Sequence, residues 1–157
     1  MDRGGNLVCT LKGTHWHKAF GHFGGQPYVS PKVEYPDRTP DYDVSEYLAE
    51  NQAILYRLTG DTYQVHVDPE VGRRRGYSAP FMQGLGTLGF AVRMGIQAAI
   101  PYQPERVTHI YAQMRKVCIP GQRVHFAGWK ISEGKIHFKL VDDQKELLLG
   151  NGILEYQ

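Results

Sequence analysis

The sequence has few cysteines, no long hydrophobic run and almost no net charge, and each shortage excludes a class of protein. Its two cysteines, Cys9 and Cys118, lie far apart, which excludes a disulfide framework and favours a reducing, cytoplasmic setting. No run of about 18 apolar residues occurs, so no membrane-spanning segment is expected. A formal charge of +2 is too small to indicate a nucleic-acid-binding protein. Residues 1–10 contain one basic residue and no apolar core, which is not the pattern of a secretory signal.

What remains is the composition of an ordinary globular domain. Hydrophobic residues make up 41% of the 157-residue chain and charged residues 22%. A chain of this length buries about two thirds of the surface that it exposes when unfolded. Residues 1–42, rich in Gly, Pro and His, are predicted to form an N-terminal arm, in which residues 29–35 are either a strand or extended chain. Residues 43–157 are predicted to form the folded domain.

Two short helices are predicted in the first part of this domain. The first begins at Asp43 or Ser45, either of which can cap a helix, and runs through Arg57. The second begins at Asp68-Pro69, because the aspartate accepts hydrogen bonds from free N–H groups and proline suits the first helical position. Asp68 is therefore assigned to structure and not to chemistry.

A long apolar helix is predicted over residues 84–100, followed only by strands. Its polar side chains are so few that we expect it to be buried on nearly all sides, inside a curved sheet. Alternating side chains predict strands over residues 106–119, 123–131, 135–141 and 146–156, with Glu133-Gly134 as a hairpin turn. One long helix followed by an antiparallel meander is an α+β architecture.

Three groups near the start of the long helix have the chemistry of an acid–base site. Asp61 and His66 are five residues apart in a non-helical connection, so a carboxylate and an imidazole can converge on one water molecule. Gly84 opens the helix, and its N–H suits an oxygen that gains negative charge. Base, acid and oxyanion donor are the parts needed to add water to a double bond conjugated to a carbonyl. An Asp after Gly is also a common turn residue, and a lone His is commonly packed or on the surface.

The segments that carry these groups resemble the signature of R-specific enoyl-CoA hydratases, within the MaoC-like dehydratase family. The resemblance rests on Tyr56-Arg57-Leu58-Thr59-Gly60-Asp61 with His66 and Asp68-Pro69, on Gly76-Tyr77 with Pro80, Gly84-Leu85 and Thr87-Leu88-Gly89, and on Pro120-Gly121-Gln122. Phe23-Gly24-Gly25 also resembles the approach to the second hot-dog unit in the hydratase part of peroxisomal multifunctional enzymes. The resemblance covers about residues 20–157 and implies a single hot-dog fold, an antiparallel sheet wrapped around a long buried helix.

The resemblance also implies roles for individual residues. Asp61 and His66 become the catalytic pair, Gly84 the oxyanion donor, and Met114 a residue that lines the acyl or thioester site. The implied reaction is the reversible syn hydration of a trans-2-enoyl-CoA to the (3R)-3-hydroxyacyl-CoA. The acyl-CoA is then the substrate, and no metal or redox cofactor is implied, because the thioester already acidifies C2. A homodimer, or a heteromer with another hot-dog subunit, is implied because sites in this fold lie where two units meet.

The sequence departs from the family pattern on both sides of the site. Tyr63-Gln64 stands where the family has Asn-Pro, so Tyr63 is expected either to donate its hydroxyl or to occlude the pocket. Gln83 replaces the His that precedes the oxyanion glycine and keeps a hydrogen-bonding side chain there. Arg57, just before the loop, can pair with a carboxylate or phosphate, or lie on the helix surface. Tyr63, Gln83 and Arg57 are therefore candidate substrate-binding residues, together with Met114.

Other functions and contacts stay open at this point. A non-catalytic acyl-CoA-binding subunit and an acyl-CoA thioesterase are the alternatives, and both a CoA and a carrier-protein thioester fit the resemblance. The three arginines at residues 73–75 are either a solvated face or a contact for an anionic ligand such as a nucleotide phosphate. The spacing of His15, His17 and His22 matches no standard zinc site, so no metal site is predicted.

Overall fold

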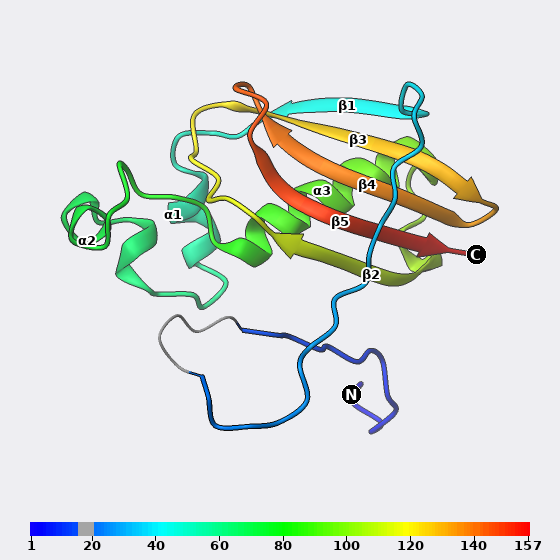
Figure 1. The fold of residues 1–157 in the computed structure, drawn as a ribbon, viewed down its shortest axis with the longest axis horizontal. Coiled ribbons are helices and arrows are strands. Elements are labelled where there is room, and N and C mark those ends of the chain that lie inside the picture. Colours follow the sequence, from blue (N-terminus) through cyan, green and yellow to red (C-terminus); the bar gives the residue numbers. More distant parts are fainter. Residues whose placement is uncertain (16–20) are drawn as a thin grey trace. The chain divides into compact units, whose positions relative to one another are not determined.

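The computed structural model describes residues 1–15 and 21–157 (Figure 1). The chain divides into two compact units, residues 1–30 and residues 31–157. The described residues of the first unit form neither helix nor strand. The predicted division of the chain between residues 42 and 43 stays a prediction. All the elements described below belong to the second unit.

The second unit is built on one antiparallel sheet whose five strands follow the order β1-β3-β4-β5-β2 (Figure 1). The strands are β1 (Tyr42–Tyr47), β2 (Val107–Met114), β3 (Arg123–Ser132), β4 (Lys135–Asp142) and β5 (Leu147–Tyr156). Gly134 has a φ of +68° and makes the tight turn between β3 and β4. The predicted hairpin at Glu133-Gly134 is confirmed, and β3, β4 and β5 form a meander. β2 lies outside this meander, because it pairs with β5 and not with the next strand in the chain, β3.

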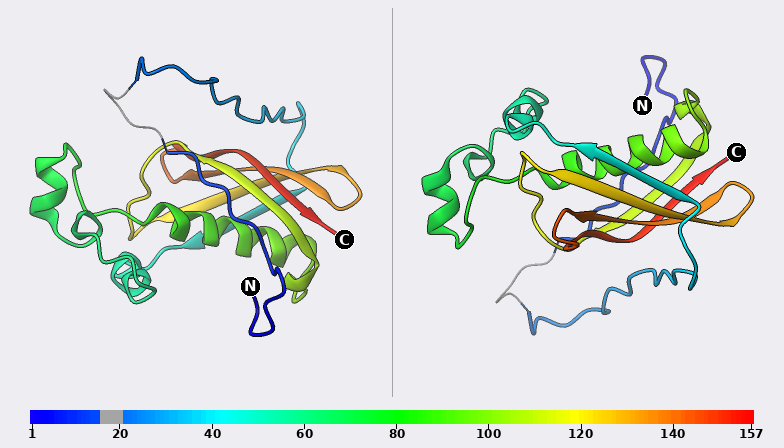
Figure 2. Two further views of the ribbon diagram at one scale, coloured as in Figure 1. Left: turned by 90° about the horizontal axis from the view of Figure 1, so that it is seen from below. Right: turned by 90° about the horizontal axis from the view of Figure 1, so that it is seen from above.

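The helices lie along and beside this sheet. They are α1 (Gln52–Arg57), α2 (Pro69–Arg74) and α3 (Gly84–Ala99), with the short 3₁₀ turns η1 (Gln64–His66) and η2 (Pro104–Arg106). α2 begins as predicted, because Asp68 accepts the N–H of Glu70 at 2.8 Å and Pro69 is the first helical residue. α1 and α2 lie at one end of the sheet, near the beginning of α3 (Figures 1 and 2).

α3 lies along one face of the sheet, and the core forms between them (Figure 2). Gly86, Thr87, Ala91, Met94 and Gly95 are its buried residues. Gly95 lets the helix approach the sheet closely, since a Cβ there would lie 3.0 Å from Leu154 and 3.1 Å from Phe126. The predicted architecture, an antiparallel sheet wrapped around a long helix, is confirmed.

The expectation that α3 is buried on nearly all sides is wrong for the single chain. Exposed residues recur every four positions along the side that the sheet does not cover: Leu85, Gly89, Arg93 and Gln97. The physical reason is that one curved sheet reaches around only part of a helix. α3 therefore carries more apolar surface than this unit covers by itself.

The segment before α1 is a strand, so the predicted helix start at Asp43 or Ser45 is also wrong. This segment pairs with β3 as β1, and half-buried residues alternate with exposed ones along it. Val44 packs against the core while Asp43 and Ser45 face outward. Pairing with a distant strand thus overrides the local helix signals, and α1 begins only at Gln52.

The strand after α3 ends at Met114, whereas the sequence predicts that it continues to residue 119. Beyond Met114 the chain turns toward the segment that precedes α3, where the carbonyl of Cys118 accepts the N–H of Met82 at 2.7 Å. This loop brings Met114 and Cys118 to the beginning of α3.

Candidate active site

The loop between α1 and α2 brings Asp61 and His66 together. α1 is followed by Gly60, whose φ of +115° favours glycine, and η1 then turns the chain back. Nε2 of His66 lies 4.0 Å from Oδ2 of Asp61. The other carboxylate oxygen, Oδ1, accepts the N–H of Tyr63 at 3.2 Å, which holds the carboxylate in place. One small polar molecule can therefore touch both side chains.

The partner of the second imidazole nitrogen sets the chemistry of His66. Nδ1 lies 2.8 Å from the carbonyl oxygen of Phe81. A carbonyl oxygen only accepts hydrogen bonds, so Nδ1 carries the proton and Nε2 of the neutral ring has a free lone pair. The ring is buried, and its faces and edges contact the rings of Tyr63 and Phe81 at centroid distances of 5.9 and 5.0 Å. His66 is thus oriented to accept a proton on the side of Asp61.

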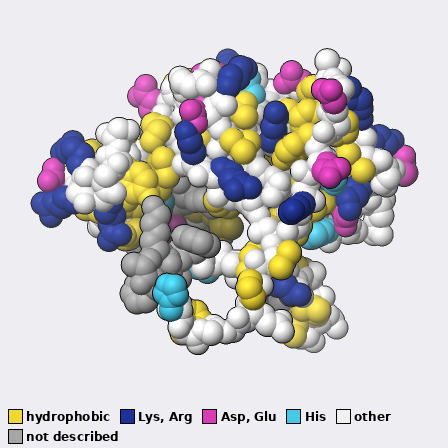
Figure 3. Space-filling view, in the orientation of Figure 1, with side chains coloured by type: hydrophobic (Ala, Val, Ile, Leu, Met, Phe, Trp, Pro, Cys, Tyr) yellow, Lys and Arg dark blue, Asp and Glu magenta, His cyan; other side chains and the backbone are white. Residues whose placement is uncertain are grey.

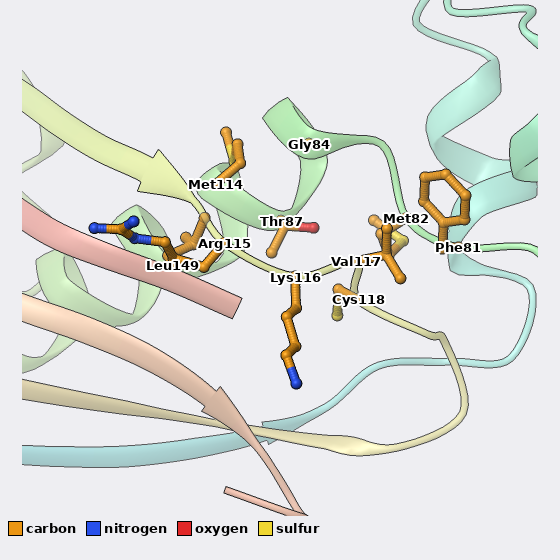
Figure 4. Close-up of a pocket in the computed structure, with 10 residues that line it drawn as sticks. All are labelled: Phe81, Met82, Gly84, Thr87, Met114, Arg115, Lys116, Val117, Cys118 and Leu149. Carbon is orange, nitrogen blue, oxygen red and sulfur yellow. The ribbon is translucent and has the colours of Figure 1, made fainter. Parts of the chain in front are cut away.

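Gly84 is the first residue of α3 and borders a cavity of about 240 Å³ (Figure 4). The cavity is lined by Phe81, Met82, Gly84, Thr87, Met114, Arg115, Lys116, Val117, Cys118 and Leu149. Because the first N–H groups of a helix have no acceptor inside the helix, the N–H of Gly84 can donate to a ligand. Met114 lies at the end of β2 and contacts the helix start, since a Cβ added to Gly84 would lie 3.6 Å from the sulfur of Met114.

Phe81 connects this cavity with the Asp61–His66 pair. Its carbonyl binds His66, and its side chain lines the cavity that Gly84 borders. Asp61 and His66 are not among the residues that line the cavity, so the two halves of the candidate site meet at Phe81. Sequence reasoning did not single out Phe81, because a phenylalanine in a loop carries no reactive group of its own.

Two of the predicted substrate-binding residues lie on the Asp61 side. Tyr63 is half exposed, and its ring lies nearly perpendicular to the ring of His66. Arg57 donates to the carbonyl of Thr62 at 2.6 Å and thereby braces the loop that carries Asp61. Arg57 therefore binds a backbone carbonyl of this loop and, among the described residues, pairs with no carboxylate.

Gln83 lies in the core and not in a pocket. Its side chain is 1% exposed, and Nε2 donates to the carbonyl of Ala53 at 3.2 Å. Oε1 has no hydrogen-bond partner among the described residues. This placement supports a role in joining α1 to the start of α3, and it does not bring the side chain to the surface that a substrate would touch.

Thr87 and Cys118 line the cavity and were not predicted as site residues. The hydroxyl of Thr87 donates to the carbonyl of Gln83 at 3.2 Å. Burial, with the charge of Asp142, raises the pKa of the Cys118 thiol to about 12. A thiol that stays protonated at neutral pH is a poor nucleophile, so Cys118 is an apolar wall.

No site for a metal and no membrane span are found in the described part of the chain. Residues 1–15 and 21–157 contain no group of three His, Cys, Asp or Glu side chains that could hold an ion. His17, one of the three histidines considered in the sequence, lies outside the described residues. None of the helices in these residues is both long and apolar enough to cross a bilayer.

Comparison with known proteins gives consistent matches. The MaoC-like domain family matches residues 31–149. The chain is 32% identical over 156 residues to peroxisomal multifunctional enzyme type 2 of Drosophila melanogaster, covering 96% of this chain and 26% of that protein. It is 33% identical over 125 residues to probable enoyl-CoA hydratase 2 of Dictyostelium discoideum, covering 78% and 42%. The crystal structure of a MaoC-like dehydratase from Phytophthora capsici superimposes with a TM-score of 0.82 at 26% identity, covering 89% and 48%.

The sheet wrapped around α3, with an Asp–His loop at the beginning of that helix, defines a hot-dog domain. More particularly, the chain belongs to the MaoC-like dehydratase family, because the family match covers most of it and a 32% identical relative covers nearly all of it. The chain spans less than half the length of each relative named above.

Proposed function

We propose that the protein catalyses the reversible hydration of a trans-2-enoyl-CoA to the (3R)-3-hydroxyacyl-CoA. The observation that carries this proposal is the pairing of Asp61 with His66, in which Nδ1 is held by the Phe81 carbonyl and Nε2 faces the carboxylate. Membership of the MaoC-like family and similarity to a probable enoyl-CoA hydratase 2 support the same reaction. The (3R) configuration follows from the resemblance of the loop to R-specific hydratases.

In this mechanism the Asp61–His66 pair holds one water molecule. Nε2 of His66 accepts a proton from the water while its oxygen bonds to C3 of the enoyl group. Negative charge then moves to the thioester oxygen, which the N–H of Gly84 stabilises. The pair returns the same proton to C2, so the elements of one water are added and the enzyme is unchanged. Both groups come from one side of the double bond, which makes the addition syn.

The test is an assay of the purified protein with crotonyl-CoA and with longer trans-2-enoyl-CoA thioesters. We expect the ultraviolet absorbance of the conjugated thioester to fall, and chiral chromatography of the product to give the (3R) alcohol. A product of (3S) configuration would contradict the stereochemical part of the proposal. No absorbance change with any chain length would contradict hydration itself.

The same assay separates the alternative functions. Release of free CoA thiol, without loss of the double bond, would identify a thioesterase. Saturable binding of acyl-CoA with neither reaction would identify a non-catalytic binding subunit.

We also propose that a second hot-dog unit, from another copy of the chain or from a different subunit, completes the functional assembly. Leu85 on the open side of α3 is 57% exposed, and half-buried Leu88, Val92 and Ile96 accompany it. β2 is the last strand of the described sheet, so one of its edges is unpaired there. Exposed apolar side chains beside a free strand edge are features that a partner normally covers.

We also propose that the protein works in the cytoplasm. This location rests on the low number of cysteines, and both Cys9 and Cys118 are free thiols. Fractionation of cells that produce the protein tests it, and recovery in an oxidising compartment would contradict it.

A further inference from the structure

A second hollow lies on the other side of Phe81 and is not used by the mechanism above. It has a volume of about 370 Å³ and is lined by Tyr63, Val65, Arg75, Tyr77 and Phe81. The rings of Tyr63 and Phe81 both contact His66, so two of the residues that line the hollow also touch the imidazole. A ligand that reacts at His66 can therefore extend into it.

Arg75, which lines this hollow, carries a positive charge that no described carboxylate neutralises. Arg73 and Arg74 both pair with Glu70, at 2.8 and 3.3 Å. Among the described residues, no carboxylate lies within ion-pair distance of Arg75. Lys and Arg side chains gather over α2, as Figure 3 shows at the edge of the molecule where Figure 1 places this helix. Of the three consecutive arginines, Arg75 is the one that lines the hollow.

The local fold holds Arg75 in place over an aromatic ring. α2 ends at Arg74, and Gly76, with a φ of +85°, turns the chain so that the N–H of Tyr77 donates to the carbonyl of Gly72 at 3.1 Å. Cζ of Arg75 then lies 5.2 Å from the centroid of the Tyr63 ring. A guanidinium over a ring keeps its N–H donors in its own plane, where they can grip an anion. The ring of Tyr63 contacts both this cation and His66.

We propose that this hollow receives the phosphopantetheine arm of the thioester substrate and that Arg75 binds the phosphate at the end of that arm. The inference rests on the proposed hydration, because it assumes that the thioester lies at His66. The methylene and gem-dimethyl groups of the arm suit the aromatic walls of Tyr63, Tyr77 and Phe81, and a phosphate suits a planar guanidinium. The acyl group is then left for the apolar cavity beside Gly84.

The experiment compares three crotonyl thioesters that differ only in the part beyond the arm. Crotonyl-pantetheine lacks the phosphate, crotonyl-phosphopantetheine has it, and crotonyl-CoA adds the adenosine half. We expect the wild-type protein to use both phosphorylated thioesters with a higher kcat/KM than crotonyl-pantetheine. Arg75→Ala should lower this preference by roughly tenfold or more, which is the usual size of a charge-assisted contact.

The matched control is Arg74→Ala, which removes the same charge from the next residue outside the hollow. An equal loss of preference in both variants would overturn the proposal, since it would show that only the general charge matters. A phosphopantetheine thioester used no better than pantetheine would also overturn it, by placing recognition in the adenosine half. Comparison of crotonyl-CoA with a crotonyl-loaded acyl carrier protein then identifies which phosphopantetheine source the protein uses.

Calorimetry separates a failure of this inference from a failure of the proposed function. If no thioester is hydrated, hydration is refuted, but phosphopantetheine should still bind more tightly than pantetheine to the wild-type protein. Loss of that difference in Arg75→Ala, with an unchanged melting temperature, would support the phosphate contact. Equal binding of the two compounds to the wild-type protein would refute it.

Discussion

At the scale of the residue, the hydrogen-bond partners of Asp61 and His66 determine what each side chain can do. His66 has one nitrogen fixed by a backbone carbonyl and the other turned toward a carboxylate. Asp61 stays half exposed and is held by the N–H of Tyr63. An oriented base next to a solvated carboxylate can accept a proton from water.

His66→Ala and Asp61→Asn should each lower kcat/KM for enoyl-CoA hydration by about 10² or more, because the first removes the proton acceptor and the second removes the negative charge beside it. Initial rates with crotonyl-CoA measure this. His125→Ala is the matched control, since His125 lies on the inner strand β3 and pairs with Asp143. Full activity in both site variants would show that the pair has no catalytic role.

Cys118 gives a prediction about pH at the same scale. Burial raises the pKa of its thiol to about 12. Because the folded-state pKa is raised, the stability that this thiol contributes is fully present below the pKa of the unfolded chain and is lost as the pH rises through the folded-state pKa. Between pH 7 and pH 10 the wild-type protein should therefore lose roughly 1–2 kcal/mol of unfolding free energy that Cys118→Ala does not lose.

Urea unfolding of both proteins at the two pH values measures this difference. Cys9→Ala, at an exposed cysteine, is the matched control and should follow the wild-type protein. An identical pH dependence in Cys118→Ala and the wild type would contradict burial of the thiol.

At the scale of the element, α3 organises both the core and the site. Its buried side fixes the distance to the sheet, while its first residue, Gly84, borders the cavity. The loops that precede and follow it, which carry Phe81 and Met114, are held by the beginning of the helix and the end of β2. A change in how α3 sits on the sheet would therefore move the cavity wall.

Gly95→Ala should destabilise the protein by roughly 1–3 kcal/mol. The new methyl group would lie closer to Leu154 and Phe126 than an ordinary van der Waals contact allows. Gly89→Ala in the same helix meets no atom within 4 Å and should be neutral or stabilising by up to about 1 kcal/mol. Denaturant unfolding of the two variants measures the contrast. A larger loss at Gly89 than at Gly95 would mean that the side of α3 away from the sheet is the more tightly packed one.

At the scale of the whole molecule, the folded unit of residues 31–157 has more apolar surface on α3 than its own sheet covers. The open side of α3 and the free edge of β2 both belong to this one unit. The chain spans less than half the length of each of the similar proteins named above. A second unit placed against them would bury Leu85, the residue next to Gly84, and so would help to close the site.

Leu85→Glu should shift the protein toward monomers, because a buried carboxylate in an apolar interface is costly. Light scattering at micromolar concentration measures the mass. Leu58→Glu, the same substitution at a leucine that is 84% exposed outside α3, is the matched control and should leave the mass unchanged. A wild-type protein that is strictly monomeric under these conditions would contradict a homodimer and leave a different hot-dog subunit as the partner.

The part of the candidate site whose residues lie close together in the chain could be predicted from the sequence. Asp61 and His66 are close in sequence, so a single turn, η1, is enough to bring them together. Gln83, by contrast, was predicted at the substrate and lies buried against Ala53, thirty residues away. Arg75 contacts Tyr63 and Phe81 contacts His66, and no sequence motif predicts either contact.

Features that depend on residues close together in the chain could be predicted from the sequence alone. They include the apolar helix from Gly84, the cap at Asp68, the turn at Glu133-Gly134 and the alternating strands of the meander. The strand at residues 42–47 and the open side of α3 depend on the folded unit as a whole and were not predicted. Periodicity and caps are local, whereas strand pairing and burial depend on residues far apart in the chain, and these long-range contacts outweigh local propensity.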